Sequence, residues 1–173
     1  MEPQLEKTIK KFNRIYYIEL FVIAAIVIVL ASLKLAGIIG TSQTSRRVFN
    51  IITLVGATYI LSDFIWLCFS KKRQRRNCWF DKISLLPLSF YLYSIDIYAL
   101  INWNAEVVEY WNILLACAFF YVAAAYIAQG LFHIKRPLPS IVMDATEEYN
   151  EAIKQAEQKV KEEASKEDKP ESK

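Results

Sequence analysis

Four long runs of apolar residues dominate the pattern of hydrophobic and polar positions along the chain. They cover residues 16–40, 48–70, 83–103 and 110–132. Each is long enough to cross about 30 Å of hydrocarbon as an α-helix, which takes about 20 residues. Between positions 20 and 33 the only polar residue is Ser32, so the first run lacks the polar stripe of a helix in a soluble bundle. None shows the alternation of a barrel strand. The pattern predicts an all-α, polytopic membrane protein with four transmembrane helices in a domain over 16–136.

A short amphipathic segment, residues 1–15, precedes the first run. Its apolar residues recur at helical spacing on one face, away from most of its basic residues: Leu5, Ile9, Phe12 and Ile15. This spacing predicts a short helix that lies in the membrane interface before the chain turns inward. A solvated leader with fortuitous spacing is the alternative, because the segment is short.

A charged tail, residues 137–173, follows the fourth run. Pro137 and Pro139 predict that the fourth span ends near Arg136. A further helix is expected over about 144–164, followed by disordered residues. It carries a narrow apolar stripe, which is too thin to fold alone and consists mainly of Tyr149, Ile153, Ala156 and Val160. The stripe predicts a surface helix or a weak coiled-coil site that binds a partner.

The distribution of charge predicts the orientation in the membrane. Residues 144–173 carry a net charge of −4 and the rest of the chain +7, so the overall +3 describes neither part. With four spans, the N-terminus, the 71–82 loop and the tail share one side, with twelve Lys or Arg residues near the span ends. The other side has Arg46 and Arg47. The positive-inside rule therefore predicts that both termini are cytoplasmic. A bacterial inner membrane and a eukaryotic endoplasmic reticulum membrane both obey this rule, so both stay open.

The most concentrated basic stretch is KKRQRR, whose charged residues are Lys71, Lys72, Arg73, Arg75 and Arg76. We interpret it as a topology determinant that also attracts anionic lipid headgroups. Because spans tether it at both ends to the bilayer surface, nuclear targeting and RNA binding are disfavoured, and no nucleic-acid partner is expected.

Polar residues inside the spans are the candidate functional residues: Asp63, Asp96, Asn102 and Glu19. An isolated carboxylate at the membrane centre costs about 3 kcal/mol or more, so Asp63 and Asp96 are expected to face protein or a water cavity. They are expected at different depths, about 10 and 20 Å from the cytoplasmic side. Two interpretations stay open, a packing role in contact with a neighbouring helix and a proton or cation pathway. Glu19 is expected at the interface.

The remaining residues that could take part in catalysis or metal binding are interpreted as structural. The single histidine, His133, lies beside Lys135 and is interpreted as a headgroup-level residue, with no second His or Cys at ligand spacing. Pro87 is expected in the first turn of the third span, where it is tolerated. The sequence shows no nucleophile–base pair, phosphate loop or metal-ligand cluster, so no catalytic residue, metal or cofactor is expected.

These observations favour a non-enzymatic integral membrane protein that binds or organises a partner through its basic cytoplasmic loop and charged tail. Its expected partners are membrane lipids and another protein, or further copies of itself through the spans and tail. The alternative is a small oligomeric channel or transporter that uses Asp96 and Asp63. A membrane-embedded lipid-modifying enzyme comes third, because such an enzyme is expected to carry more catalytic side chains at the interface.

Overall fold

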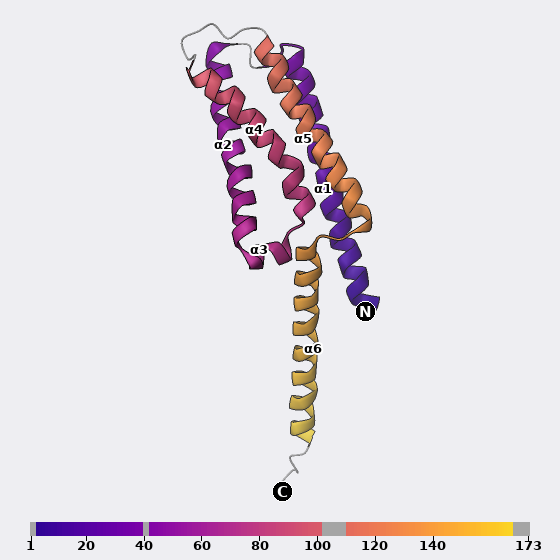
Figure 1. Cartoon of the computed structure of the whole chain (residues 1–173). Helices are drawn as coiled ribbons and strands as arrows, with labels where there is room; N and C mark the ends of the chain where they lie inside the picture. Colours follow the sequence, from indigo (N-terminus) through magenta and orange to yellow (C-terminus); the bar gives the residue numbers. More distant parts are fainter. Residues whose placement is uncertain (1–2, 40–41, 102–109, 168–173) are drawn as a thin grey trace.

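The computed structural model describes residues 3–39, 42–101 and 110–167 (Figure 1). These residues form helices and no strand, and four of the helices, α1, α2, α4 and α5, are long and apolar enough to cross a membrane. The prediction of a helical chain with four candidate spans is therefore confirmed. The helices are α1 (Pro3–Leu35), α2 (Gln43–Phe69), α3 (Lys71–Arg76), α4 (Trp79–Ile101), α5 (Tyr110–Lys135) and α6 (Pro139–Glu167).

The four long helices pack as two pairs. α1 packs along α5 and α2 along α4, and the pairs meet through α4 and α5 (Figure 1). Small residues let the α1 and α5 backbones approach closely. Ala24 and Ala31 of α1 and Ala123 of α5 are buried, and a Cβ added to Gly130 would lie 2.9 Å from the ring of Phe21. The first and last spans, far apart in the sequence, are thus neighbours in the fold.

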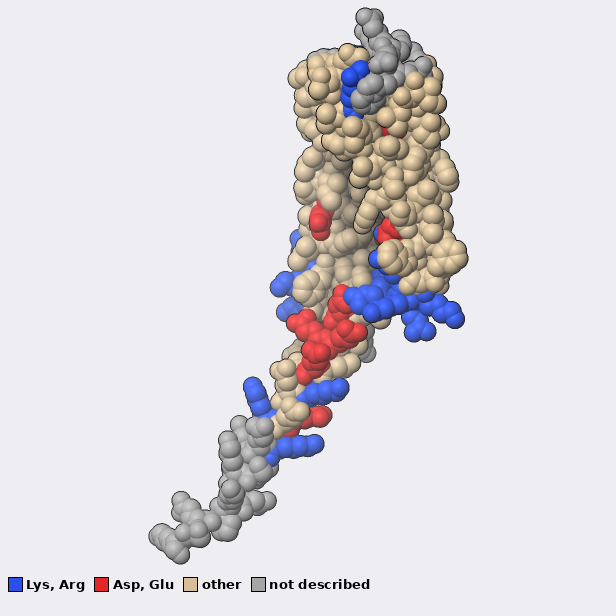
Figure 2. Space-filling view, turned by 90° about the vertical axis from the view of Figure 1, so that its left-hand side faces the viewer, with Lys and Arg blue, Asp and Glu red and all other residues tan. Residues whose placement is uncertain are grey.

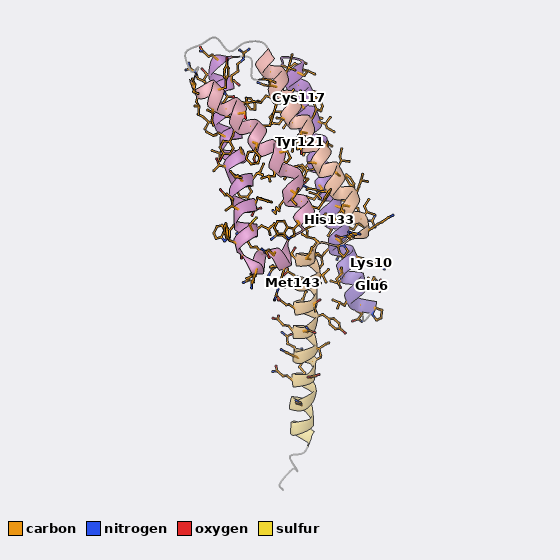
Figure 3. The ribbon with its side chains drawn as sticks, viewed as in Figure 1. Glu6, Lys10, Cys117, Tyr121, His133 and Met143 are labelled. Carbon is orange, nitrogen blue, oxygen red and sulfur yellow. The ribbon has the colours of Figure 1, made fainter. Side chains whose placement is uncertain are left out.

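Over the described residues 3–15 there is no separate interfacial helix of the kind expected, because α1 continues through them without a break. No Gly or Pro lies between positions 4 and 36, so nothing in the backbone chemistry ends the helix at the change in polarity. Its 33 residues span about 50 Å, which exceeds the hydrocarbon thickness. The first turns therefore project beyond the apolar belt, where Glu6 and Lys10 form a salt bridge of 2.6 Å (Figure 3).

Pro87 lies inside α4 and not in its first turn, because α4 begins well before the apolar run. Proline has no N–H, so Pro87 leaves the carbonyl of Ile83, four residues earlier, without its helical donor. Side chains of α5 donate to carbonyls in this part of α4. The hydroxyl of Tyr121 donates to the carbonyl of Ser84 at 2.9 Å, and Nε2 of Gln129 donates to the carbonyl of Asp81 at 3.0 Å. These bonds join α5 to the first half of α4.

The two terminal segments and the basic loop lie at one end of the bundle (Figure 1). Figure 2 shows Lys and Arg side chains gathered there, with Asp and Glu on the first part of α6 just beyond them. Lys34 lies toward the opposite end, buried with its Nζ 4.8 Å from the centre of the Phe49 ring. With Lys34 added to Arg46 and Arg47, that end has three Lys or Arg residues, against twelve at the end that carries the termini and the basic loop.

Helix α6 begins at Pro139, earlier than the expected start near 144, because proline is well tolerated in the first turn of a helix. Its first turns pack against α1 and α3, where Ala145 is 4% exposed. Asp144 and Arg76 form a salt bridge of 2.5 Å at this contact. Beyond it, residues 150–159 are all exposed, and α6 projects away from the bundle (Figure 1). The tail was expected to be disordered beyond about 164, but α6 continues to Glu167, and residues 168–173 lie outside the described residues.

Candidate functional site

A buried pair of a carboxylate and an imidazole lies where α4 begins and α5 ends. Asp81 is in the first turn of α4 and His133 in the last turn of α5 (Figure 3). Nε2 of His133 lies 2.9 Å from Oδ1 and 3.0 Å from Oδ2 of Asp81. His133 is 1% exposed and Asp81 is 8% exposed. The histidine that sequence analysis set aside as a headgroup-level residue is therefore enclosed by protein.

A hydrogen bond on the other side of the ring defines the tautomer of His133. Its Nδ1 lies 2.8 Å from the backbone carbonyl of Arg136. A carbonyl can only accept, so Nδ1 carries a proton and donates it. Nε2 is left facing the carboxylate of Asp81. In the imidazolium form Nε2 carries a proton and donates it to Asp81. In the neutral form Nε2 has no proton, and its lone pair faces the carboxylate.

Helix α1 closes the third side of this pair. The ring of Tyr16 meets the ring of His133 edge to face, with centroids 5.3 Å apart. Nδ2 of Asn13 donates to the backbone carbonyl of His133 at 2.6 Å, and Asn13 is 6% exposed. Three helices therefore position the imidazole, which restricts its rotation.

Cys78 brings a thiol to the same place from the turn before α4. Its sulfur, a carboxylate oxygen of Asp81 and a ring nitrogen of His133 all lie within 4.8 Å of one another. Thiolate, carboxylate and imidazole are the three donor types that zinc takes in proteins. This cluster of Cys78, Asp81 and His133, here called the CDH cluster, could hold a metal ion.

A cavity of about 270 Å³ adjoins the CDH cluster between α1, α2, α4 and α5. Asp81, Tyr16 and Gln129 contribute to its wall, together with Asp63 and Lys82 and a larger set of apolar side chains. This volume accommodates several water molecules, and the polar groups offer them partners. A small polar ligand or a hydrated ion would fit the same space.

Asp63, a candidate from the sequence, is doubly paired with cations. Its Oδ1 accepts from Nη1 of Arg73 at 2.9 Å, and its Oδ2 accepts from Nζ of Lys82 at 2.5 Å. The guanidinium of Arg73 also lies 4.5 Å from the centre of the Trp66 ring. Asp63 therefore fastens the basic loop to α2.

Asp96 of α4, the second intramembrane candidate, is fully buried and contacts α2, the helix along which α4 packs. Its Oδ1 accepts from the hydroxyl of Thr53 at 2.9 Å, and its Oδ2 has no hydrogen-bond partner among the described residues. Thr53 and Asp63 are ten residues apart on α2, about 15 Å along the axis, so the two carboxylates do not meet. Glu19 is exposed, and Asn102 lies outside the described residues.

The basic stretch forms the short helix α3. The hydroxyl of Ser70 accepts from the backbone N–H of Arg73 at 3.4 Å, and Nε2 of Gln74 donates to the carbonyls of Leu67 and Cys68 at 3.0 Å. These bonds satisfy groups at the end of α2 and the start of α3. Arg73 and Arg76 are held by carboxylates, whereas the exposed cations are Lys71, Lys72 and Arg75.

The apolar stripe of the tail is half-buried at its first residue and exposed further along α6. Tyr149 is half-buried and borders a groove that Leu5 of α1 also lines. Ile153 is 37% exposed, and Ala156 is exposed as well. Val160 lies on α6, and its side chain is outside the described part of the chain. The stripe is therefore open to solvent from Ile153 onward in the part whose side chains are described.

Sequence reasoning missed the CDH cluster because its members come from different spans. A usable signal was present, since Asp81 and His133 both lie at the basic-side ends of consecutive long apolar helices, which places them at a similar depth. Cys78 is three residues before Asp81, so both side chains lie near the start of α4. Comparisons of the chain with protein-family models, with curated proteins and with solved structures give no match.

Proposed function

We propose that the protein is a non-enzymatic, four-span membrane protein with both termini in the cytoplasm, which docks an amphipathic helix of another protein on α6. The observation that carries this proposal is the position of α6. Its base is packed on the bundle and its remainder projects with residues 150–159 exposed (Figure 1). A helix held at one end and open along the rest is suited to binding a partner.

The charge distribution supports the cytoplasmic orientation. The N-terminal segment, α3 and α6 lie at the same end of the bundle, and the Lys and Arg count favours that end by twelve to three. Positive charge is retained on the cytoplasmic side of membrane proteins. The exposed cations Lys71, Lys72 and Arg75 are suited to binding anionic headgroups around the base of α6.

The sequence of α6 supports a different protein as the occupant, in preference to a second copy. The stripe has the four-three spacing of a coiled-coil seam, with Ile153 and Val160 at a positions and Ala156 at a d position. In a parallel pair of α6 helices, Glu157 at an e position would face Ala152 of the other copy, and Lys159 at a g position would face Ala164. Since flanking charge pairs select coiled-coil partners, α6 has no charge complement in itself.

Photocrosslinking of the full-length protein in its native membrane tests the proposal. A photoreactive residue at Ala152 or Glu157, which flank the stripe and are exposed, should give a crosslink to one protein that persists at high salt, because apolar contacts are not screened. The double variant Ile153→Asp with Val160→Asp should lose this crosslink. The matched control, Gln155→Asp with Gln158→Asp away from the stripe, adds the same two negative charges and should retain it.

Three outcomes contradict the docking proposal. They are the absence of any crosslink, a crosslink that the stripe variants leave unchanged, and a crosslink that joins only two copies of this chain. The last would instead make α6 a self-association helix.

A small channel or transporter is the second candidate, favoured by the buried oxygen of Asp96 that lacks a partner among the described residues. An unpaired carboxylate oxygen inside a membrane bundle is typical of a proton or cation pathway. In that case Asp96→Asn should abolish cation or proton flux in reconstituted vesicles while expression is retained. If the unmodified protein shows no flux, this candidate is excluded.

A further inference from the structure

We propose that the CDH cluster of Cys78, Asp81 and His133 binds one Zn²⁺ ion at the wall of the cavity between α1, α2, α4 and α5. This site is independent of the docking surface on α6. It would bind a divalent ion through one thiolate sulfur, one carboxylate oxygen and Nε2 of the imidazole.

The positions of the donor atoms suit zinc. Zinc–ligand bonds of about 2.0–2.3 Å in a tetrahedron place the donor atoms roughly 3–4 Å from one another. The three donor atoms of the CDH cluster already lie within 4.8 Å of one another, on side chains from the residue before α4, the first turn of α4 and the last turn of α5. Small side-chain rotations are therefore enough to close them around one ion.

The orientation of His133 supports the same site. A histidine that binds a metal through one nitrogen usually donates its other N–H to a carbonyl or carboxylate. Nδ1 of His133 donates to the carbonyl of Arg136 at 2.8 Å, which leaves Nε2 directed at Asp81. A neutral imidazole would then set a lone pair against a carboxylate, and a cation between the two groups removes that repulsion.

The balance of charge also favours a dication. Binding of Zn²⁺ would release to solvent the thiol proton of Cys78, and the Nε2 proton of His133 where it is present. The resulting thiolate and the carboxylate of Asp81 carry two negative charges, which one Zn²⁺ neutralises. Burying a charge without a partner costs several kcal/mol, so a neutral assembly suits residues that are as buried as Asp81 and His133. Lys82, the nearest lysine in the chain, is paired with Asp63 and does not fill this role.

Three protein ligands leave a fourth coordination position. Structural zinc sites usually have four protein ligands, whereas sites that bind water or a substrate have three. Asp81 borders the cavity of about 270 Å³, so a water or a small ligand from that cavity can take the fourth position. The site therefore belongs to the class of zinc sites that exchange a ligand.

Metal analysis of the purified full-length protein tests the proposal. After equilibration with Zn²⁺ and gel filtration, elemental analysis should find one zinc per chain. Substitution by Co²⁺ should give a thiolate-to-cobalt charge-transfer band in the absorption spectrum. Cys78→Ser should lose the band and His133→Gln should lose the metal. The control variants Cys68→Ser and Cys117→Ser, which alter exposed cysteines outside the cluster, should keep both.

Cys78→Ser decides the matter if His133→Gln fails to fold, because Cys78 is half-buried and precedes α4. Wild-type protein that retains no zinc overturns the proposal and leaves Asp81 and His133 as an ion pair. Zinc bound equally by Cys78→Ser and wild type, or lost in a control variant, also overturns it. The crosslinking of α6 uses residues on another helix, so failure of one proposal is distinguishable from failure of the other.

Discussion

Replacement of Gly130 by alanine tests the close approach of α1 and α5. The new Cβ would lie 2.9 Å from Cε1 and Cζ of Phe21, closer than the 3.5–4.0 Å or so of optimal carbon contacts. The ring or the helix must move, and such overpacking costs about 1–3 kcal/mol. Alanine also gains about 1 kcal/mol over glycine in helix propensity. The net loss in the free energy of unfolding is therefore about 0–2 kcal/mol.

Gly56 in α2 provides a matched control. A Cβ at this position meets nothing within 4 Å, so Gly56→Ala has the gain in helix propensity without overpacking. It should stabilise the protein by up to about 1 kcal/mol. The two glycine-to-alanine variants should then differ by about 1–3 kcal/mol in the free energy of unfolding, which is the overpacking term alone.

The assay is equilibrium unfolding of purified protein in mixed micelles with increasing SDS, followed by circular dichroism. Phe21→Leu in the Gly130→Ala background should recover part of the loss, and the double-mutant cycle isolates the contact between the two residues. Equal stability of Gly130→Ala and Gly56→Ala would refute the close approach. A coupling of zero between positions 21 and 130 would refute it as well.

Three further predictions concern the other contacts. Thr53→Val should lower the free energy of unfolding by about 0.6–1.7 kcal/mol in the same assay, because it removes the hydroxyl that donates to Asp96. Arg76→Gln should increase proteolysis at the base of α6 at low salt only, because the partly exposed pair with Asp144 is worth no more than about 1 kcal/mol and is screened at high salt. A membrane-impermeant thiol reagent applied on the non-cytoplasmic side should label a cysteine placed in the α1–α2 connection and leave a cysteine placed at the exposed Lys72 unlabelled, as cytoplasmic termini require.

Each of these has an outcome that contradicts it. The control for Thr53 is Thr44→Val at an exposed position of α2, and equal effects at both positions would deny the buried hydrogen bond a role. Proteolysis of Arg76→Gln that is independent of salt would mean that the ion pair does not hold α6. Labelling of a cysteine at position 72 from the non-cytoplasmic side would contradict the proposed orientation, provided that the reagent is shown not to cross the membrane.

The spans could be predicted from the sequence because hydrocarbon demands a long apolar helix, and this demand appears as an unbroken run of residues. The ends of the helices could not be predicted in the same way. Polarity changes at residue 15, but the backbone of α1 continues from Pro3 because helix continuity depends on the absence of breakers and not on hydropathy. Pro87 shows the same limit, since the helix that contains it begins with residues too polar to belong to the apolar run.

The CDH cluster needed knowledge of which helices are neighbours. Each of its residues is unremarkable in its own segment, and the sequence pattern of one span does not predict which residues of another span it contacts. Only the packing of α4 on α5, with α1 closing the third side, turns His133 from an isolated residue at a helix end into part of a buried group. Asp63 and Asp96 were recognisable because a carboxylate in an apolar run is conspicuous by itself.

The pairing of the first span with the last has a consequence for how the chain is made. Asn13 and the carbonyl of His133 that it contacts are 120 residues apart. At a synthesis rate of about 5–20 residues per second, the ribosome adds α5 roughly 6–24 s after that part of α1. Throughout this interval Asn13 lacks its native partner, whereas α2 and α4 can already meet. During this interval α1 is exposed on the face that later packs against α5, and a membrane chaperone or a quality-control protease would encounter the chain in this state.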